Sequence, residues 1–435
     1  MPEVSKRITG GIEISPANLK KIQKKIKNVS DFKERVETSL TGNITEILEV
    51  VLGGAVSLNA SDIHIEPKEE KVKMRVRVDG VLQDLLFFEK KLYQTILSRL
   101  KLLSGIKLNI TDRPQDGRFS VILEKGDVEI RSSTLPSEHG ESFVLRVLNP
   151  KNLRDIEVLG LREDLLELFK KEIKKPNGMV IVTGPTGSGK TTTLYAFLKK
   201  IHRPEIKIIT IEDPIEYHLK EASQTQVAPK KGYDFASGLK SIMRQDPDVI
   251  LVGEIRDLKT CEIALQASLT GHLVLTTLHT NDAAGTIARL VNLGARPTDI
   301  GPAINMAVAQ RLVRKVCPKC LELKNPTPQE SKKIKKELKG IPQQVKIPKI
   351  GKAMKIPKVK GCKHCNYTGY RGRLGIFEAF LVDDKMEKFI LKNPSIAALR
   401  EEAVKRGMIT MRQDGLIKVL EGTTTIEEIE RVAVY

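Results

Sequence analysis

The sequence predicts an α/β fold, in which a parallel sheet is covered by helices on both faces and is preceded by a smaller α+β domain. From about residue 177, continuous apolar runs alternate with helical patterns, which is typical of strands buried on both faces. A glycine-rich phosphate-binding pattern lies between the first of these runs and the next helix. Before residue 150, shorter stretches alternate apolar and polar residues instead, as in half-buried strands. At 435 residues, the chain has room for about three domains.

The first 40 residues are rich in lysine and show no convincing apolar periodicity, so we expect an arm or the remnant of another domain over 1–40. The opening "MPEVSKRITGG" lacks the apolar core of a signal peptide. No run approaches the ~18 apolar residues that a membrane span needs. We therefore expect a cytoplasmic chain that reaches a membrane only through a partner.

Residues 41–150 form the predicted α+β domain. Apolar residues have helical spacing over 44–55, and apolar residues alternate with basic ones from Lys71 to Val78. The remaining expected features are the strand "SDIHIEP", turns at Asp79-Gly80, Asp116-Gly117 and Lys125-Gly126, a helix over about 90–103, and the strand "ESFVLRVL".

The rest of the chain divides into four predicted parts. These are a linker and helix (151–176), the α/β core (177–312), an insert that carries four cysteines (313–375) and a helical C-terminal subdomain (376–435). Within the core we expect the strand "GMVIVTG", helix 190–200, strand 206–211, helix 235–245, strand 249–252, helix 258–269 and strand 273–278. In the C-terminal part, Gly407 is a helix stop and Thr425 to Glu428 is a capping box.

The stretch "GPTGSGKT" fits the phosphate-loop pattern G-x-x-x-x-G-K-[ST] at every fixed position. Backbone N–H groups and a helix N-terminus form a positive cradle for phosphates in such loops. We expect Lys190 to reach the β- and γ-phosphates and Thr191 to bind Mg²⁺. The residues expected to contact nucleotide here are Gly184, Pro185, Thr186, Gly187, Ser188, Gly189, Lys190, Thr191 and Thr192.

Acidic residues follow two of the predicted strands. Glu212 and Asp213 follow one strand, and Glu254 follows "VILVG". The carboxyl ends of parallel strands share one edge of a sheet, so these acids should lie near the phosphates. One should hold the Mg²⁺ shell and one should orient the attacking water, and the sequence leaves open whether Glu212 or Glu254 activates the water.

Two histidines flank the strand "LVLTTL". We group His272, before the strand, with the nucleotide-binding residues, and His279, after it, with the acids. A lone histidine is more often structural than catalytic, so His279 is either a γ-phosphate sensor or a structural residue.

Four of the five cysteines form two C-x-x-C pairs, Cys317 with Cys320 and Cys362 with Cys365. In a reducing compartment this pattern indicates metal binding, and four thiolates complete the tetrahedral shell of a structural Zn²⁺. Two unrelated turns or redox pairs are the alternative. Cys261 lies in a helical pattern and is expected to be a small buried residue.

The formal net charge is +19, which suits nucleic acid, an anionic membrane or acidic protein surfaces. There is no tryptophan and aromatic residues make up 4%, so stacking platforms for single strands are scarce. Many lysines gather in residues 20–27 and 332–360, where they could simply form a solvated face. We interpret "KIPKIGKAMKIPKVKG" as a loop pinned by the metal and hypothesise that it docks a protein. A deletion of residues 330–358 that leaves partner binding intact would contradict this hypothesis.

In order, "GPTGSGKTTTLY", "TIEDPIEYHL", "RQDPDVILVGEIRD" and "GHLVLTTLHTNDA" resemble the Walker A, Asp box, Walker B and His box of the secretion ATPases. The smaller domain matches through "SDIHIEP", "RVDGVLQ", "RPQDGRFS" and "STLPSEHGESFVLRVL", and the tail through "GMITMRQDGLIKVLEGTTTIEEIERV". The resemblance covers about residues 41–435 and is nearest to the type II secretion branch. It implies a RecA-like ATPase core behind a PAS-like domain, with ATP, Mg²⁺ and Zn²⁺ as cofactors.

The resemblance also implies a hexameric ring with nucleotide bound between the two domains. Arg118, Arg131 and Arg244 match arginines that neutralise transition-state charge, although ordinary strand-surface contacts are the alternative. Extension ATPases carry the tetracysteine insert and retraction ATPases of type IV pili lack it. The expected partner is a platform protein of a secretion or pilus system on the cytoplasmic face of the inner membrane. Only about 40 residues precede the matching region, so recruitment through the family's extra N-terminal domain is in doubt.

The predicted function is an ATP-driven motor for pilin or pseudopilin assembly, in type II secretion or type IV pilus extension. A nucleic-acid translocase is the alternative and would show DNA-stimulated turnover with a steep salt dependence. The aromatic poverty counts against it, so no nucleic acid is expected. A retraction motor and a zinc-binding adaptor fit less well. The sequence does not distinguish secretion, pilus extension and DNA uptake.

Overall fold

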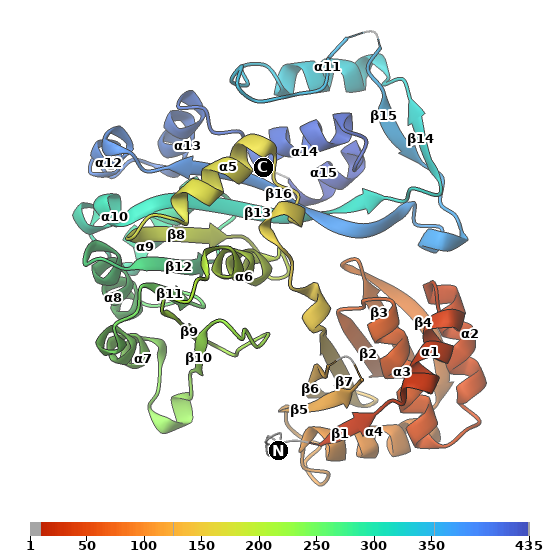
Figure 1. Ribbon diagram of the computed structural model, residues 1–435. Helices are drawn as coiled ribbons and strands as arrows, with labels where there is room; N and C mark the ends of the chain where they lie inside the picture. Colours follow the sequence, from red (N-terminus) through yellow and green to blue (C-terminus); the bar gives the residue numbers. More distant parts are fainter. Residues whose placement is uncertain (1–9, 125, 352, 434–435) are drawn as a thin grey trace. The chain divides into compact units, whose positions relative to one another are not determined.

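The computed structural model describes residues 10–124, 126–351 and 353–433, which form two compact units (Figure 1). Of the described residues, those up to Asn152 belong to the first unit, together with residues 360–371. The second unit contains residues 153–359 and the chain from Gly372 onward. No helix among the described residues is long and apolar enough to cross a membrane.

The first unit is built on a seven-stranded sheet with the order β1-β5-β6-β7-β2-β3-β4. Buried residues from its strands share one core with four helices, among them Phe32, Leu52, Val76 and Phe119. The strands are β1 (Gly11–Glu13), β2 (Asp62–Pro67), β3 (Lys71–Val78), β4 (Val81–Glu89), β5 (Gln115–Ile122), β6 (Val128–Ser137) and β7 (Gly140–Leu148). The helices are α1 (Pro16–Lys25), α2 (Val29–Ser39), α3 (Ile44–Ser57), α4 (Lys90–Ser104) and the 3₁₀ turn Pro150–Asn152.

Over 1–40 the sequence predicts an arm or the remnant of another domain, but the described residues 10–40 are part of the first unit. β1 pairs with β5, and α1 and α2 pack on α3. Ile22, Phe32 and Val36 are buried in the core of the unit. A Cβ on Gly54 would lie 2.2 Å from the Phe32 ring, so this glycine lets α2 approach α3. Charged and polar residues separate the apolar positions of α1 and α2, so their helical spacing was not recognised.

Of the three predicted turns, one is confirmed and one is wrong, and the third, at Lys125-Gly126, includes a residue outside the described ranges. Asp79 and Gly80 have positive φ and join β3 to β4, as a two-residue hairpin turn requires. Asp116 and Gly117 instead lie inside β5, where they pair with Ser133 and Ser132. A Cβ on Gly117 would come within 2.4 Å of the Ser104 carbonyl, so the glycine permits close contact with the end of α4.

The second unit contains the predicted parallel sheet, with the strand order β10-β9-β11-β12-β8-β13-β16. Every pairing from β10 to β13 is parallel. The predicted ranges 249–252, 258–269 and 273–278 are confirmed residue for residue, whereas β10, β13 and β16 were not predicted. The strands are β8 (Gly178–Thr183), β9 (Ile208–Glu212), β10 (Ser223–Gln226), β11 (Val249–Val252), β12 (Leu273–Leu278), β13 (Ile304–Val316) and β16 (Tyr370–Leu381).

Helices cover both faces of this sheet. Met179 and Ile181 of β8 pack in one cluster with residues of α7, α8 and α9, while Val180 and Val182 pack in another with residues of α5 and α6. The helices are α5 (Glu163–Glu172), α6 (Lys190–Ile201), α7 (Phe235–Ile242), α8 (Leu258–Leu269), α9 (Ala284–Leu293), α10 (Pro297–Ala303), α11 (Pro328–Glu337), α12 (Asp384–Ile390), α13 (Ile396–Lys405), α14 (Met411–Leu420) and α15 (Ile426–Val432), with 3₁₀ turns at Ile156–Val158, Pro229–Lys231, Met243–Gln245 and Lys363–Cys365.

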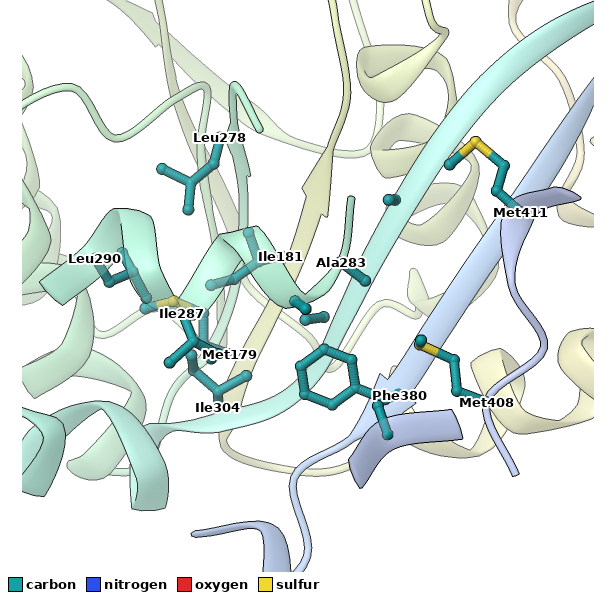
Figure 2. Close-up of a cluster of buried hydrophobic side chains, with 14 of the residues drawn as sticks. Met179, Ile181, Leu278, Ala283, Ile287, Leu290, Ile304, Phe380, Met408 and Met411 are labelled. Atoms are coloured by element: carbon teal, nitrogen blue, oxygen red, sulfur yellow. The ribbon is translucent and has the colours of Figure 1, made fainter. Parts of the chain in front are cut away.

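The C-terminal helices share the core of the sheet. Figure 2 shows Phe380, Met408 and Met411 in the same cluster as Met179 and Ile181. In the insert, α11 buries Ile334 in this cluster, and β14 (Leu321–Lys324) pairs with β15 (Ile356–Val359). Within the stretch predicted as a loop (346–361), β15 is the regular structure among the described residues, while β14 and α11 precede that stretch.

The two helix-end predictions in the C-terminal part agree with the structure to different degrees. Gly407 has a φ of +98° directly after α13, as a helix stop requires. Thr425 caps α15 by accepting a hydrogen bond from the Glu428 N–H, which is one half of a capping box. Burial would raise the pKa of the Glu428 carboxyl, but hydrogen bonds from the Arg431 and Arg314 side chains and from the Arg314 N–H hold it at about 2.

Candidate functional site

The phosphate loop (residues 184–191) lies between β8 and α6 at the carboxyl edge of the sheet. Gly184, Gly187 and Gly189 all have positive φ, which side chains other than glycine rarely adopt. A Cβ on Gly184 would also lie 2.5 Å from the Gln310 carbonyl oxygen, so no larger residue fits. The first N–H groups of α6 therefore point into a turn that can approach an anion closely.

The side chains of the loop also fit a bound phosphate. Lys190 is only 9% exposed, and its Nζ donates to the carbonyls of Gly184 (2.8 Å) and Pro185 (3.3 Å). Burial lowers the pKa of Lys190, against the opposing charges of Glu254 and Glu216. Ser188 Oγ is buried and has no hydrogen-bond partner among the described residues. A buried hydroxyl without a partner is costly, and a phosphate oxygen would satisfy it.

The rest of the predicted loop residues surround these two side chains. Pro185, Thr186 and Gly187 are exposed, and Thr191 and Thr192 are half-buried in the first turn of α6. Mg²⁺ prefers oxygen ligands and keeps several waters, so the accessible Thr191 hydroxyl suits it.

Glu254 and His279 meet at the same edge of the sheet. Glu254 follows β11, His279 follows β12, and His279 Nε2 lies 3.3 Å from Glu254 Oε2. Burial and the charge of Lys190 lower the pKa of His279, while Glu254 opposes this effect. The imidazole is therefore mainly neutral near pH 7.

Arg256 links Glu254 to the third predicted acid. Its Nη2 forms an ion pair with Glu254 Oε1, and its Nη1 lies 3.5 Å from Asp213 Oδ2. The sequence reasoning did not select Arg256, although it lies two residues after Glu254 in "GEIRD". It also passed over Glu216, whose charge acts on Lys190.

Glu212 occupies a different environment from Glu254. It is 3% exposed, and its carboxylate accepts hydrogen bonds from the Tyr195 hydroxyl, from Thr210 Oγ1 (2.6 Å) and from Gln224 Nε2 (3.1 Å). Burial raises the pKa of this carboxyl, and the three donors only partly oppose that effect. Its hydrogen bonds thus tie Glu212 to β9, β10 and α6 inside the unit.

Two predicted site residues, His272 and Arg244, lie away from the phosphate loop of their own chain. His272 precedes β12 and lies beside Gly178, the first residue of β8, with Nδ1 3.0 Å from the Ala267 carbonyl. At a rise of about 3.3 Å per residue, the strand separates His272 from the loop by roughly 17–20 Å. Arg244 follows α7, and the next residue, Gln245, accepts a hydrogen bond from Lys207, just before β9. Both residues therefore lie at the amino edge of the sheet.

Arg118 and Arg131 belong to the first unit and lie directly opposite each other on β5 and β6. The strand register continues this row through Arg146 on β7, Asp62 on β2 and Arg77 on β3. Asp62 lies within 3.2 Å of Arg146 Nε and 3.3 Å of Arg77 Nε. Because paired residues share one face of a sheet, the four arginines form a row on that face, and two of them, Arg77 and Arg146, pair with Asp62. The sequence reasoning found two of the four, since the register that joins them is not visible in one sequence.

The four predicted metal ligands form one cluster. The sulfur atoms of Cys317, Cys320, Cys362 and Cys365 all lie within 4.8 Å of one another. Zn–S bonds of about 2.3 Å would place tetrahedral sulfurs about 3.8 Å apart, which is the distance from Cys362 Sγ to Cys365 Sγ. The backbone N–H groups of Cys362 and Gly369 point at Cys365 Sγ, as expected around a thiolate ligand. These residues fit a closed structural zinc site.

Comparison with known proteins places this geometry in a family. Residues 37–431 match the family model described as Type II/IV secretion system protein. The chain is 43% identical to the Type II secretion system ATPase E of Vibrio cholerae, over 89% of this chain and 75% of that protein. It is 41% identical to the type IV pilus assembly ATPase PilB of Myxococcus xanthus, over 89% of this chain and 67% of that protein. The ATPase DotB of Legionella pneumophila has a similar fold, with a TM-score of 0.63 at 22% identity over 89% of this chain and 95% of that one.

Proposed function

Because the chain belongs to the Type II/IV secretion system protein family and is an ATPase of that family, we propose that it powers the assembly of pilin-like subunits at the inner membrane. The process would be type II secretion or type IV pilus extension. The observation that carries the proposal is the meeting of Lys190, Glu254 and His279 at the edge where the phosphate loop lies.

The phosphate loop binds the triphosphate. Its glycines expose backbone N–H groups, Ser188 Oγ donates to a phosphate oxygen, and Lys190 exchanges loop carbonyls for the charged β- and γ-oxygens, which are stronger acceptors. Thr191 would hold Mg²⁺, which neutralises charge on the phosphates.

Glu254 is the residue that orients the attacking water. It lies close enough to Lys190 to act on its pKa, and Arg256 and His279 fix its two oxygens. The water attacks the γ-phosphorus, the bond from that phosphorus to the β–γ bridging oxygen breaks, and ADP, phosphate and one proton leave. Glu212 is tied up by three neutral donors and has a structural role.

Neutral His279 positions Glu254 and meets the γ-phosphate from the same edge. In a ring, Arg118 and Arg131 would complete the nucleotide site from the sheet face that they share. Arg244 lies at the far edge of its own sheet, so it would act on a neighbouring copy or stabilise α7 through its contact with Ser241. The expected ring is a hexamer.

The remaining features fit an extension motor. The cysteine cluster matches the zinc insert of extension ATPases and is proposed to stabilise that part of the chain. From the family we further propose that the predicted domain boundaries hold and that the first unit is PAS-like. The chain would work on the cytoplasmic face of the inner membrane, with a platform protein as its partner.

Two measurements test these assignments. We expect the wild-type chain to hydrolyse ATP with Mg²⁺, and we expect cross-linked pull-down from native membranes with a Glu254→Gln chain to recover a polytopic membrane protein and pilin-like subunits. Recovery of nucleic acid with no membrane partner would contradict the proposal.

The metal assignment has its own test. We expect about one zinc per chain by elemental analysis, and chelation should lower the unfolding temperature, since structural zinc contributes folding free energy. Cys320→Ser should lose the metal, while the control Cys261→Ala should keep it, because Cys261 lies in α8 outside the cluster. Full zinc content in Cys320→Ser would contradict the site.

A further inference from the structure

Two neighbouring residues of β13 form the floor of the phosphate loop. Gly184 has so little clearance that a Cβ would lie 2.5 Å from the Gln310 carbonyl oxygen and 3.2 Å from Arg311 Nη1. On the other side, the Gln310 side chain accepts a hydrogen bond from Thr193 Oγ1 (2.8 Å), and its Nε2 would lie 2.9 Å from a Cβ on Gly189. Successive residues of a strand point to opposite faces, so Gln310 and Arg311 reach the two ends of the loop.

Arg311 also contacts the segment after His279, which we call the His279 loop (residues 279–283). Its Nη2 donates to the Asn281 carbonyl at 2.8 Å, and its Nη1 donates to the Gln310 carbonyl at 3.1 Å. The residue is 8% exposed, so this guanidinium is largely removed from water. Its planar fork fixes the direction of both hydrogen bonds.

The phosphate loop and the His279 loop are joined at one further point. Thr183, the last residue of β8, receives a hydrogen bond from the Thr280 N–H (2.8 Å), and the two hydroxyls lie 2.7 Å apart. The His279 loop is thus held both from β8 and from β13.

The far end of the His279 loop is anchored to C-terminal elements. Glu378 of β16 accepts hydrogen bonds from the N–H groups of Ala283 (2.9 Å) and Met411 (3.0 Å), and Arg400 of α13 forms an ion pair with Asp282. Ala283 and Met411 belong to the buried cluster drawn in Figure 2. Asp282 and Ala283 are therefore held in place at the far end of this loop.

We propose that Arg311 is a positioning residue that couples occupancy of the phosphate loop to the placement of His279. This inference rests on the proposed role of His279 in hydrolysis. The interior is closely packed, so any shift of Gly184 on binding phosphate displaces the Gln310 carbonyl or the Arg311 guanidinium. Arg311 transfers that displacement to the Asn281 carbonyl, two residues from His279, and so to the contact between His279 and Glu254.

The first test uses Arg311→Lys with Arg314→Lys as the matched control. Arg314 lies three residues further along β13, and its N–H and its side chain bond the Glu428 carboxylate. A lysine keeps the charge but loses the fork. Arg311→Lys should lower kcat about 10–100-fold while KM changes less than about threefold, because misplaced groups impair the chemical step more than binding. Arg314→Lys should change stability only.

A double-mutant cycle separates positioning from general damage. If Arg311 acts through His279, Arg311→Lys should cost less than about threefold in a His279→Ala background, because the two changes are not additive. Full additivity would overturn the proposal. Failure of wild-type hydrolysis, or unchanged kcat in His279→Ala, would instead count against the proposed function and against the inference that rests on it.

Hydrogen exchange gives a readout that needs no turnover. In the wild-type chain, a non-hydrolysable ATP analogue should protect the amides of residues 279–285 and 309–312 together with those of the phosphate loop. Arg311→Lys should retain protection in the phosphate loop and lose it at 279–285. Protection confined to the phosphate loop and α6 in the wild-type chain would overturn the proposal even if the variant fails to fold.

Discussion

Two glutamates, one at the end of β9 and one just after β11, lie at the same edge of one sheet. Their side chains have different neighbours. Glu212 is enclosed by Tyr195, Thr210 and Gln224, all neutral donors. Glu254 instead faces charged or titratable partners, Arg256 and His279, and acts on Lys190. A strand-end position therefore brings a carboxylate to the edge, but its neighbours decide whether it is available for chemistry.

The largest effect expected from this difference is on turnover. Glu254→Gln should lower kcat by about 10²–10⁴-fold, the range for removal of a general base. The affinity for ATP should stay within a few-fold, because the phosphate loop is unchanged. Steady-state hydrolysis and binding of a fluorescent ATP analogue measure the two quantities. Equal losses in binding and turnover would mean that Glu254 holds the nucleotide instead of orienting the water.

A smaller effect is expected at the residue that touches Glu254 from β12. His279→Ala should lower kcat by up to about 100-fold, since Glu254 loses one of the contacts that fix it. His279→Gln keeps an N–H donor near the same place and should recover part of the loss. An unchanged kcat in His279→Ala would show that Arg256 alone positions Glu254.

Substitution of Glu212, at the end of β9, should mainly affect stability. Glu212→Gln places an amide NH₂ among donors, so we expect the free energy of unfolding to fall by about 1–3 kcal/mol. Denaturant titration measures this change. Tyr195→Phe removes one donor and should lower stability by less. A Glu212→Gln chain of full stability would contradict the buried network.

The smallest expected effect is a pH dependence at Glu212. Burial raises the pKa of this carboxyl, so the folded chain binds its proton more tightly than the unfolded chain does. Its contribution to stability is complete below the unfolded pKa of about 4.3 and is lost as pH rises through the folded pKa. The stability difference between wild type and Glu212→Gln should therefore shrink from pH 5 to pH 7.5. A difference that grows with pH would show that the three donors outweigh burial.

Much of the second unit could be predicted because its strands are buried on both faces. The runs at 249–252 and 273–278 are continuous and apolar, and the helix between them has a clear period. β13 was not predicted because the predicted boundary between the α/β core (177–312) and the insert (313–375) falls inside it. The helices in residues 10–40 were not predicted because charged and polar residues separate the apolar positions of α1 and α2.

The sequence predicted those site residues that directly follow a parallel strand, because the carboxyl ends of parallel strands share one edge of the sheet. Glu254 and His279 come together because both follow parallel strands. His272 was grouped with the nucleotide-binding residues, but it precedes its strand and lies at the opposite edge of the sheet. Arg311 and Gln310 come from a strand 120 residues beyond the phosphate loop, and the enclosure of Glu212 depends on Tyr195 and Gln224. Contacts between residues so distant in the sequence depend on how the strands and helices pack, which a single sequence does not show.

The most direct test compares Glu254→Gln and Glu212→Gln in single-turnover hydrolysis, since the two changes are identical in chemistry. With the enzyme in excess over ATP, phosphate formation should slow by about 10²–10⁴-fold in Glu254→Gln and by less than about tenfold in Glu212→Gln. Wild-type rates in the first variant and a large loss in the second would reverse the assignment and make Glu212 the residue that activates water.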